Sequence, residues 1–67
     1  MMFTFVPSEP TTFEPFVVMG STKTAAARQA AHDYGFKVPS HKVWITSSDE
    51  VVVETAYGSA VIGFLTY

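Results

Sequence analysis

The sequence predicts an α+β fold in which one alanine-rich helix packs on a four- to five-stranded, mostly antiparallel sheet, in the order ββαβββ. The helix is indicated by the run "STKTAAARQAAHDYGFKV" at residues 21–38, which has a helix-capping start and a glycine stop. The strands are indicated by apolar runs on both sides of it, several of which alternate with polar residues. Because the chain has 67 residues, we expect a single small domain over 1–67.

The helix is expected over residues 22–34. Ser21 or Thr22 can accept hydrogen bonds from the free N–H groups of the first turn, and Gly35 stands where a left-handed residue closes a helix. One side of the helix forms a stripe of small residues with a tyrosine at its end: Ala26, Ala27, Ala30, Ala31 and Tyr34. An alanine stripe lets a helix lie close to a sheet, but it contributes little apolar area, so larger side chains from the strands must fill the core.

The strands are expected on both sides of the helix. The second one contains Pro15, which removes a ladder donor, so this strand should lie at an edge or be shortened to Phe16–Met19. The expected ranges are Met2–Val6, Thr11–Met19, His41–Thr46, Val51–Tyr57 and Ala60–Tyr67.

The last two strands are separated by Gly58 and Ser59, a composition typical of a two-residue hairpin turn. This turn would pair Val53 with Phe64 and place both on one face. The other face of the hairpin is also apolar, and only Glu54 interrupts it.

One helix can cover only one face of such a sheet, so the second face should carry an apolar patch, and monomers rarely leave such patches without a use. If Val43 and Ile45 point at the helix, Trp44 points away from it. We therefore expect a partner-binding surface formed by Trp44, Lys42, Glu54 and Tyr67. The polar helix face, with Arg28 and His32, is the alternative docking surface.

Composition and charge exclude several classes of protein. There is no cysteine for a disulfide or a thiolate metal site, and the net charge of −2 is too small for electrostatic steering of nucleic acid. The first ten residues, "MMFTFVPSEP", have neither the basic start nor the apolar run of a signal peptide, and no apolar run is long enough to span a bilayer. These features favour a cytoplasmic protein.

No motif indicates an active site, a metal site or a cofactor site. His32 and His41 are not brought together by any spacing, and Asp49 and Glu50 are neighbours in a predicted turn, where they should be solvated. A metal site built from His32, Asp33 and His41 would need ligands to converge from separate elements. We therefore expect a non-enzymatic protein without cofactors.

Other interpretations remain open beside a protein-interaction module. Trp44, Phe3 or Phe5 could stack on the bases of single-stranded nucleic acid while Lys37 and Lys42 contact phosphates. The apolar face could instead close against a second copy in a structural homodimer. Finally, the N-terminal strands could fold over Trp44 and make it part of a two-sided core.

The run "PFVVMGSTKTAAARQAAHDYGFKV", a strand followed by a capped alanine helix and a glycine stop, resembles a unit of small phage-encoded inhibitors. These are the host-takeover and anti-CRISPR proteins, and the resemblance covers roughly residues 12–57 at the level of architecture. It implies a stoichiometric inhibitor that binds a bacterial nucleoprotein or polymerase complex and blocks a functional site. Many anti-CRISPR proteins are strongly acidic and this chain is not, which favours apolar or mixed docking over imitation of DNA charge.

Overall fold

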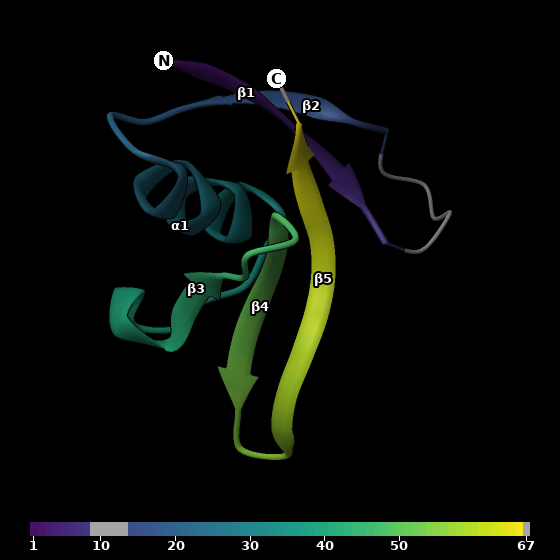
Figure 1. The fold of residues 1–67 in the computed structure, drawn as a ribbon. Coiled ribbons are helices and arrows are strands. Elements are labelled where there is room, and N and C mark those ends of the chain that lie inside the picture. The colour runs from purple at the N-terminus through teal and green to yellow at the C-terminus, as the bar shows by residue number, and fades with distance from the viewer. Residues whose placement is uncertain (9–13, 67) are drawn as a thin grey trace.

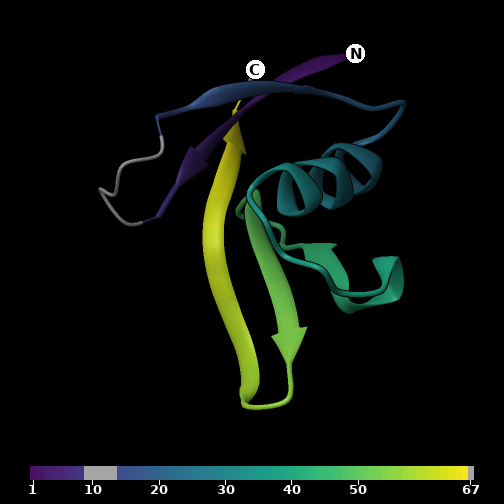
Figure 2. The ribbon, with the colours of Figure 1, turned by 180° about the vertical axis from the view of Figure 1, so that it is seen from behind.

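The computed structural model describes residues 1–8 and 14–66. One helix, α1, packs on a five-stranded antiparallel sheet in the order β2-β1-β5-β4-β3, which confirms the predicted α+β class (Figure 1). Seen from behind, the helix again lies on one side of the sheet only (Figure 2). The elements are β1 (Met2–Pro7), β2 (Phe16–Met19), α1 (Lys23–Asp33), the 3₁₀ turn η1 (Ser40–Lys42), β3 (Val43–Ile45), β4 (Glu50–Thr55) and β5 (Gly58–Thr66).

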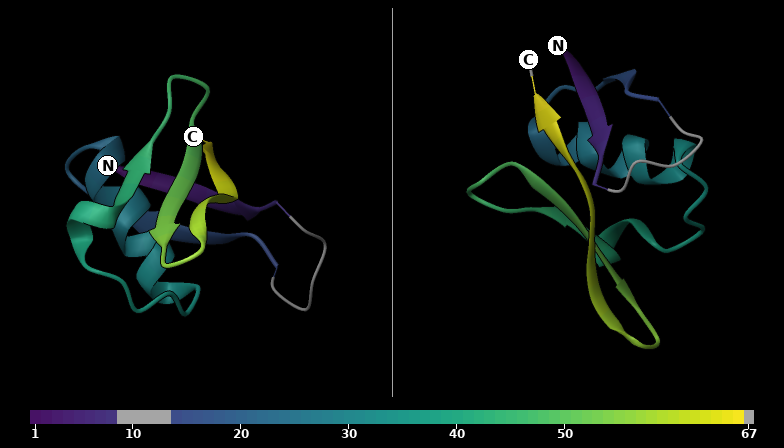
Figure 3. Two further views of the ribbon diagram at one scale, coloured as in Figure 1. Left: turned by 90° about the horizontal axis from the view of Figure 1, so that it is seen from below. Right: turned by 90° about the vertical axis from the view of Figure 1, so that its right-hand side faces the viewer.

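The long strand β5 joins the two halves of the sheet. Its first part pairs with β4 and its last part pairs with β1, and it curves strongly between them (Figures 1 and 3). The curvature coincides with a β-bulge, because Val52 pairs with Val61 while Val51 pairs with Gly63, which leaves Ile62 as the extra residue. The bulge keeps Ile62 on the core side and turns Phe64 to the opposite side.

Both helix ends close as the sequence predicts. Thr22 is the N-cap, and its hydroxyl oxygen accepts a hydrogen bond from the Ala25 amide at 3.1 Å. At the C-terminus, the Phe36 amide donates to the Ala31 carbonyl and the Gly35 amide donates to the His32 carbonyl, a Schellman motif with Gly35 at a φ of 102°.

The predicted alanine stripe forms the buried side of the helix. Ala26, Ala27 and Ala30 are fully buried, and Ala31 is almost so. The space left by these small side chains is filled by a row of aromatic rings, with centroid distances of 5.3 Å from Phe5 to Phe16, 5.4 Å from Phe5 to Tyr34 and 5.8 Å from Tyr34 to Phe36. The aromatic row thus replaces the area that alanine cannot supply.

The predicted hairpin turn is wrong by two residues. Thr55 pairs with Gly58, so the turn consists of Ala56 and Tyr57 rather than Gly58 and Ser59. The Thr55 hydroxyl donates to the Gly58 carbonyl at 2.9 Å and accepts from the Tyr57 amide at 3.1 Å, which stabilises the turn at this position. Gly58 follows at a φ of 118°, a conformation that favours glycine.

The corrected register also changes the faces of the hairpin. Val53 pairs with Ala60 instead of Phe64, and Val53 and Phe64 lie on opposite faces beyond the bulge. The tip of the hairpin projects away from α1, and the Tyr57 side chain at this tip is 100% exposed (Figure 1).

The third predicted strand is shorter than expected, because His41 and Lys42 lie in η1 and only Val43–Ile45 is extended. The shortened form of the second strand, Phe16–Met19, is confirmed. The remaining part of the longer prediction at residues 11–13, like Tyr67, lies outside the described residues.

Asp49 was expected to be a solvated turn residue, but the structure gives it two specific partners. Its carboxylate forms an ion pair with the Lys23 ammonium at 2.9 Å, which joins the first turn of α1 to the loop between β3 and β4. Its carbonyl accepts from the Leu65 amide at 2.9 Å, and its backbone has a φ of 62°. This loop is therefore fixed to both the helix and β5.

Replacing Gly63 with alanine is expected to destabilise the protein by about 1–3 kcal/mol through overpacking. A Cβ at this position would lie 2.4 Å from the Val6 carbonyl oxygen and 2.5 Å from the Phe5 ring. Urea denaturation followed by circular dichroism measures the effect. Ser59→Ala, at an exposed position of the same strand, is the control and should change the stability by less than about 0.5 kcal/mol. Equal stability of Gly63→Ala and wild type would contradict the contact between Phe5 and Gly63.

The Lys23–Asp49 pair is expected to contribute less than about 1 kcal/mol, because both side chains are more than a third exposed (39% and 37%). A double-mutant cycle of Lys23→Met and Asp49→Asn measures the coupling, and asparagine also tolerates the left-handed backbone. The coupling should shrink in high salt. A coupling that does not change with salt would show that the two side chains interact by packing rather than by charge.

Candidate functional site

The face of the sheet turned away from α1, called here the open face, carries exposed apolar side chains. Trp44, Val61 and Phe64 are 37%, 44% and 43% exposed, respectively. Trp44 pairs with Val52, and Val52 pairs with Val61, so these three side chains lie side by side across β3, β4 and β5. Val52 is only 7% exposed, because its neighbours cover it. This group confirms the predicted apolar second face.

The open face continues onto the other half of the sheet. Met2 pairs with Met19, and Val17 pairs with Thr4. These residues alternate with the core residues of β1 and β2, so their side chains lie on the open face. The exposed fractions of Met2, Val17 and Met19 are 62%, 57% and 65%. The apolar side chains of the open face therefore extend over all five strands.

Two carboxylates flank the tryptophan. Glu50 and Glu54 lie on the same face of β4 as Val52, two positions before and after it, and both are exposed. Since a strand rises about 3.3 Å per residue, the Cα atoms of Glu50 and Glu54 lie about 13 Å apart. The part of the open face on β3, β4 and β5, called here the Trp44 half, thus has an apolar centre with a carboxylate on each side. Such a surface is complementary to an apolar patch bordered by lysine or arginine.

The structure brings together only some of the predicted contact residues. Trp44 and Glu54 share the open face, whereas Lys42 lies in η1, outside the strand on which it was expected to accompany Trp44. Tyr67 lies outside the described residues. Arg28 and His32 are exposed on α1, on the other side of the sheet, so they cannot belong to the same contact surface.

Sequence reasoning missed Phe64 as a member of the open face, because simple alternation placed it opposite Val53. The signal that could have found it is Gly63, since a glycine inside a strand often marks a bulge. Val17 and Met19 were also missed as exposed residues, although they alternate with the core residues Phe16 and Val18.

The described residues do not support a two-sided core. β1 pairs with β5 and extends the sheet instead of folding over Trp44. Phe3 and Phe5 are core residues at 2% and 0% exposure, so these two rings cannot stack on bases, and the nucleic-acid hypothesis is left with Trp44, Lys37 and Lys42. Glu50 and Glu54 beside Trp44 would also repel a phosphate backbone.

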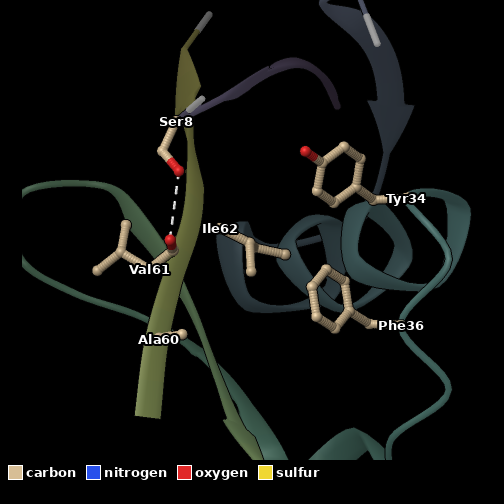
Figure 4. Close-up of a pocket in the computed structure, with 6 residues that line it drawn as sticks. All are labelled: Ser8, Tyr34, Phe36, Ala60, Val61 and Ile62. Carbon is tan, nitrogen blue, oxygen red and sulfur yellow. Dashed lines mark hydrogen bonds between the residues drawn. The ribbon is translucent and has the colours of Figure 1, made fainter. Parts of the chain in front are cut away.

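A pocket of about 230 Å³ lies on the helix side, between the end of α1 and β5 (Figure 4). The rings of Tyr34 and Phe36 point toward Ile62, and the Ser8 hydroxyl donates to the Val61 carbonyl at 3.3 Å. Among the described residues, no charged side chain lines it. The pocket is smaller than the ~300 Å³ typical of small-molecule sites, and the hydroxyl groups in its lining are those of Tyr34 and of Ser8, whose hydroxyl is bound to a carbonyl.

The acidic residues and histidines that the structure describes do not gather around a possible cation. Within residues 1–8 and 14–66, no group of three histidine, aspartate or glutamate side chains could hold a metal ion. His32 lies near its neighbour Asp33, with 3.6 Å between Nδ1 and Oδ1, and both are on the exposed helix face. In the same part of the chain, no helix has the length and hydropathy that a membrane crossing requires.

Comparison of the chain with protein-family models, curated proteins and solved structures finds no match.

Proposed function

We propose that the protein is a non-enzymatic interaction module that docks the Trp44 half of its open face on a larger protein. The observation that carries the proposal is the contiguous row of Trp44, Val52 and Val61 beside Phe64, in which Trp44, Val61 and Phe64 are exposed to solvent. Tryptophan is among the residues that most often dominate the binding energy of protein interfaces. Glu50 and Glu54 would then form the polar rim.

The acidic rim favours a partner with basic groups around an apolar patch. Proteins that bind nucleic acids carry such basic surfaces. Together with the resemblance to phage-encoded inhibitors, this makes a bacterial nucleoprotein machine, such as a CRISPR effector or a polymerase complex, the proposed partner. In this proposal the protein acts in the bacterial cytoplasm by occupying a functional site of that machine.

The docking surface can be tested by photo-crosslinking in bacterial extracts. A photoreactive phenylalanine analogue at position 64 is expected to crosslink one bacterial protein, and the same analogue at Gln29 on the exposed helix face is the matched control. Crosslinks from position 29 but not from position 64 would move the docking surface to the polar helix face. Crosslinks from neither position would reject the docking proposal.

With the partner identified, Trp44→Ala is expected to weaken its binding by tenfold or more, about 1.4 kcal/mol or above, because the substitution removes the largest aromatic side chain of the surface. Its effect on the free energy of unfolding should be smaller, about 1 kcal/mol, since the ring is partly exposed. Titration calorimetry and urea denaturation measure the two effects. A variant that unfolds without a selective loss of binding would assign Trp44 to the core.

The inhibitor role can be tested separately in bacteria whose active CRISPR effectors restrict a phage. Expression of the wild-type protein is expected to restore phage plating, and Val61→Lys is expected to abolish the restoration because it buries a charge in the contact. Gln29→Lys, with the same change on the helix, should retain it. If the wild-type protein restores plating against none of the effectors, CRISPR inhibition is rejected, and the crosslinked protein defines the machine instead.

A further inference from the structure

We propose that two copies of the chain join through the outer edges of their β2 strands, so that the two sheets form one continuous sheet. In the described part of the chain, no strand pairs with this edge, because β2 is the terminal strand of the sheet. The proposal concerns a different surface from the Trp44 half of the open face, which lies on β3, β4 and β5.

The alternation of hydrogen-bonded pairs between β1 and β2 shows which backbone amides and carbonyls of β2 point away from the sheet. The Gly20 amide donates to the Met1 carbonyl at 3.1 Å, and the register continues from this pair as Met19 to Met2 and Val18 to Phe3. Hydrogen-bonded pairs alternate with non-hydrogen-bonded pairs in an antiparallel ladder. Phe16 and Val18 therefore bond inward to β1, and the amides and carbonyls of Val17 and Met19 point away from the sheet.

A second contact supports this phase. The Ser8 amide donates to the Ile62 carbonyl at 3.0 Å, so the even-numbered residues of β1 bond to β5 and its odd-numbered residues bond to β2. Both ladders of β1 agree, which fixes the orientation of the outward groups on β2.

The four residues of β2 carry no charge and no bulge, and Glu14 and Pro15 precede them. Edge strands are commonly blunted by charges, inward-pointing polar residues or bulges. β2 has the sequence FVVM without a charge, and Val17 and Met19 are 57% and 65% exposed. Met2, which pairs with Met19, is 62% exposed and widens the apolar border.

The opposite edge of the sheet differs. β3 has three residues, and the Val43 amide donates to the Ser40 carbonyl in η1, so this donor is already satisfied. Lys42 stands directly before the strand. The β3 edge is therefore shorter than the β2 edge and partly closed by η1, and β2 is the edge better suited to pairing.

The chemistry of the edge favours a second copy as its occupant. An antiparallel, two-fold pairing centred on Val18 sets Val17 opposite Met19 of the second copy, and both residues have their amides and carbonyls directed at each other. The same pairing brings apolar side chains against apolar side chains and no charge against a like charge. A domain of 67 residues without cysteine also belongs to the size class that gains most stability from association.

The test uses Val17→Pro, which removes an outward amide. Val17 does not bond to β1, so the inward ladder keeps its hydrogen bonds, and proline is tolerated on edge strands. Light scattering across micromolar to millimolar concentrations should give the wild type a mass approaching twice the monomer's 7.3 kDa, and Val17→Pro should remain at the monomer mass. Circular dichroism checks that the variant is folded.

Two further variants keep the test decisive. Met19→Lys should also give a monomer, by placing like charges across the junction, and it replaces Val17→Pro if that variant does not fold. Val61→Lys, the same kind of change on the open face of an interior strand, should remain a dimer. A wild type that stays monomeric at all concentrations overturns the proposal. This holds even if the β2 edge turns out to bind another protein and Val17→Pro abolishes that binding.

A dimer that Val61→Lys disrupts and Val17→Pro leaves intact would also overturn it, in favour of face-to-face association. These outcomes are separate from those of the docking proposal, because dimerisation is measured on the purified protein and docking is measured by crosslinks from position 64.

Discussion

The close approach of α1 to the sheet is the constraint on which the remaining structure depends. Four buried alanines form the contact, and at Gly20 a Cβ would lie 2.5 Å from the Ala26 amide nitrogen, so both the helix and the chain that leads into it require small residues. Because alanine supplies little apolar area, the aromatic row headed by Phe5 must complete the core. All of this packing lies on one face of the sheet, which leaves the other face without a covering element in the described residues.

The bulge at Ile62 decides the composition of the open face. It allows two successive residues, Ile62 and Gly63, to lie toward the core, and it turns Phe64 outward beside Val61. Gly63 has no side chain because the Phe5 ring occupies that space. A requirement of the core on one side of β5 thus determines which aromatic residue the other side presents to a partner.

The features that could be predicted from the sequence depend on local periodicity. The alanine stripe, the closure at Gly35 and the outward orientation of Trp44 follow from the spacing of neighbouring residues. The hairpin register did not follow from alternation, because it depends on the Thr55 side chain and on the contact between Phe5 and Gly63, which are distant in the chain; Gly63 was its one local signal. The ion pair between Lys23 and Asp49 could not be predicted either, because the two residues are 26 positions apart in the chain. For the candidate site, the sequence therefore predicted the tryptophan but not its aromatic neighbour.

The hairpin tip has a consequence for the use of this protein as a scaffold. Ala56 and Tyr57 contribute nothing to the buried core, and the Thr55 hydroxyl fixes the turn locally. Insertions succeed mainly at such exposed loop tips, where the added chain does not interrupt packed elements. A peptide epitope or a fluorophore attachment site placed between these two residues would therefore report on the molecule from a position away from both the β2 edge and the helix.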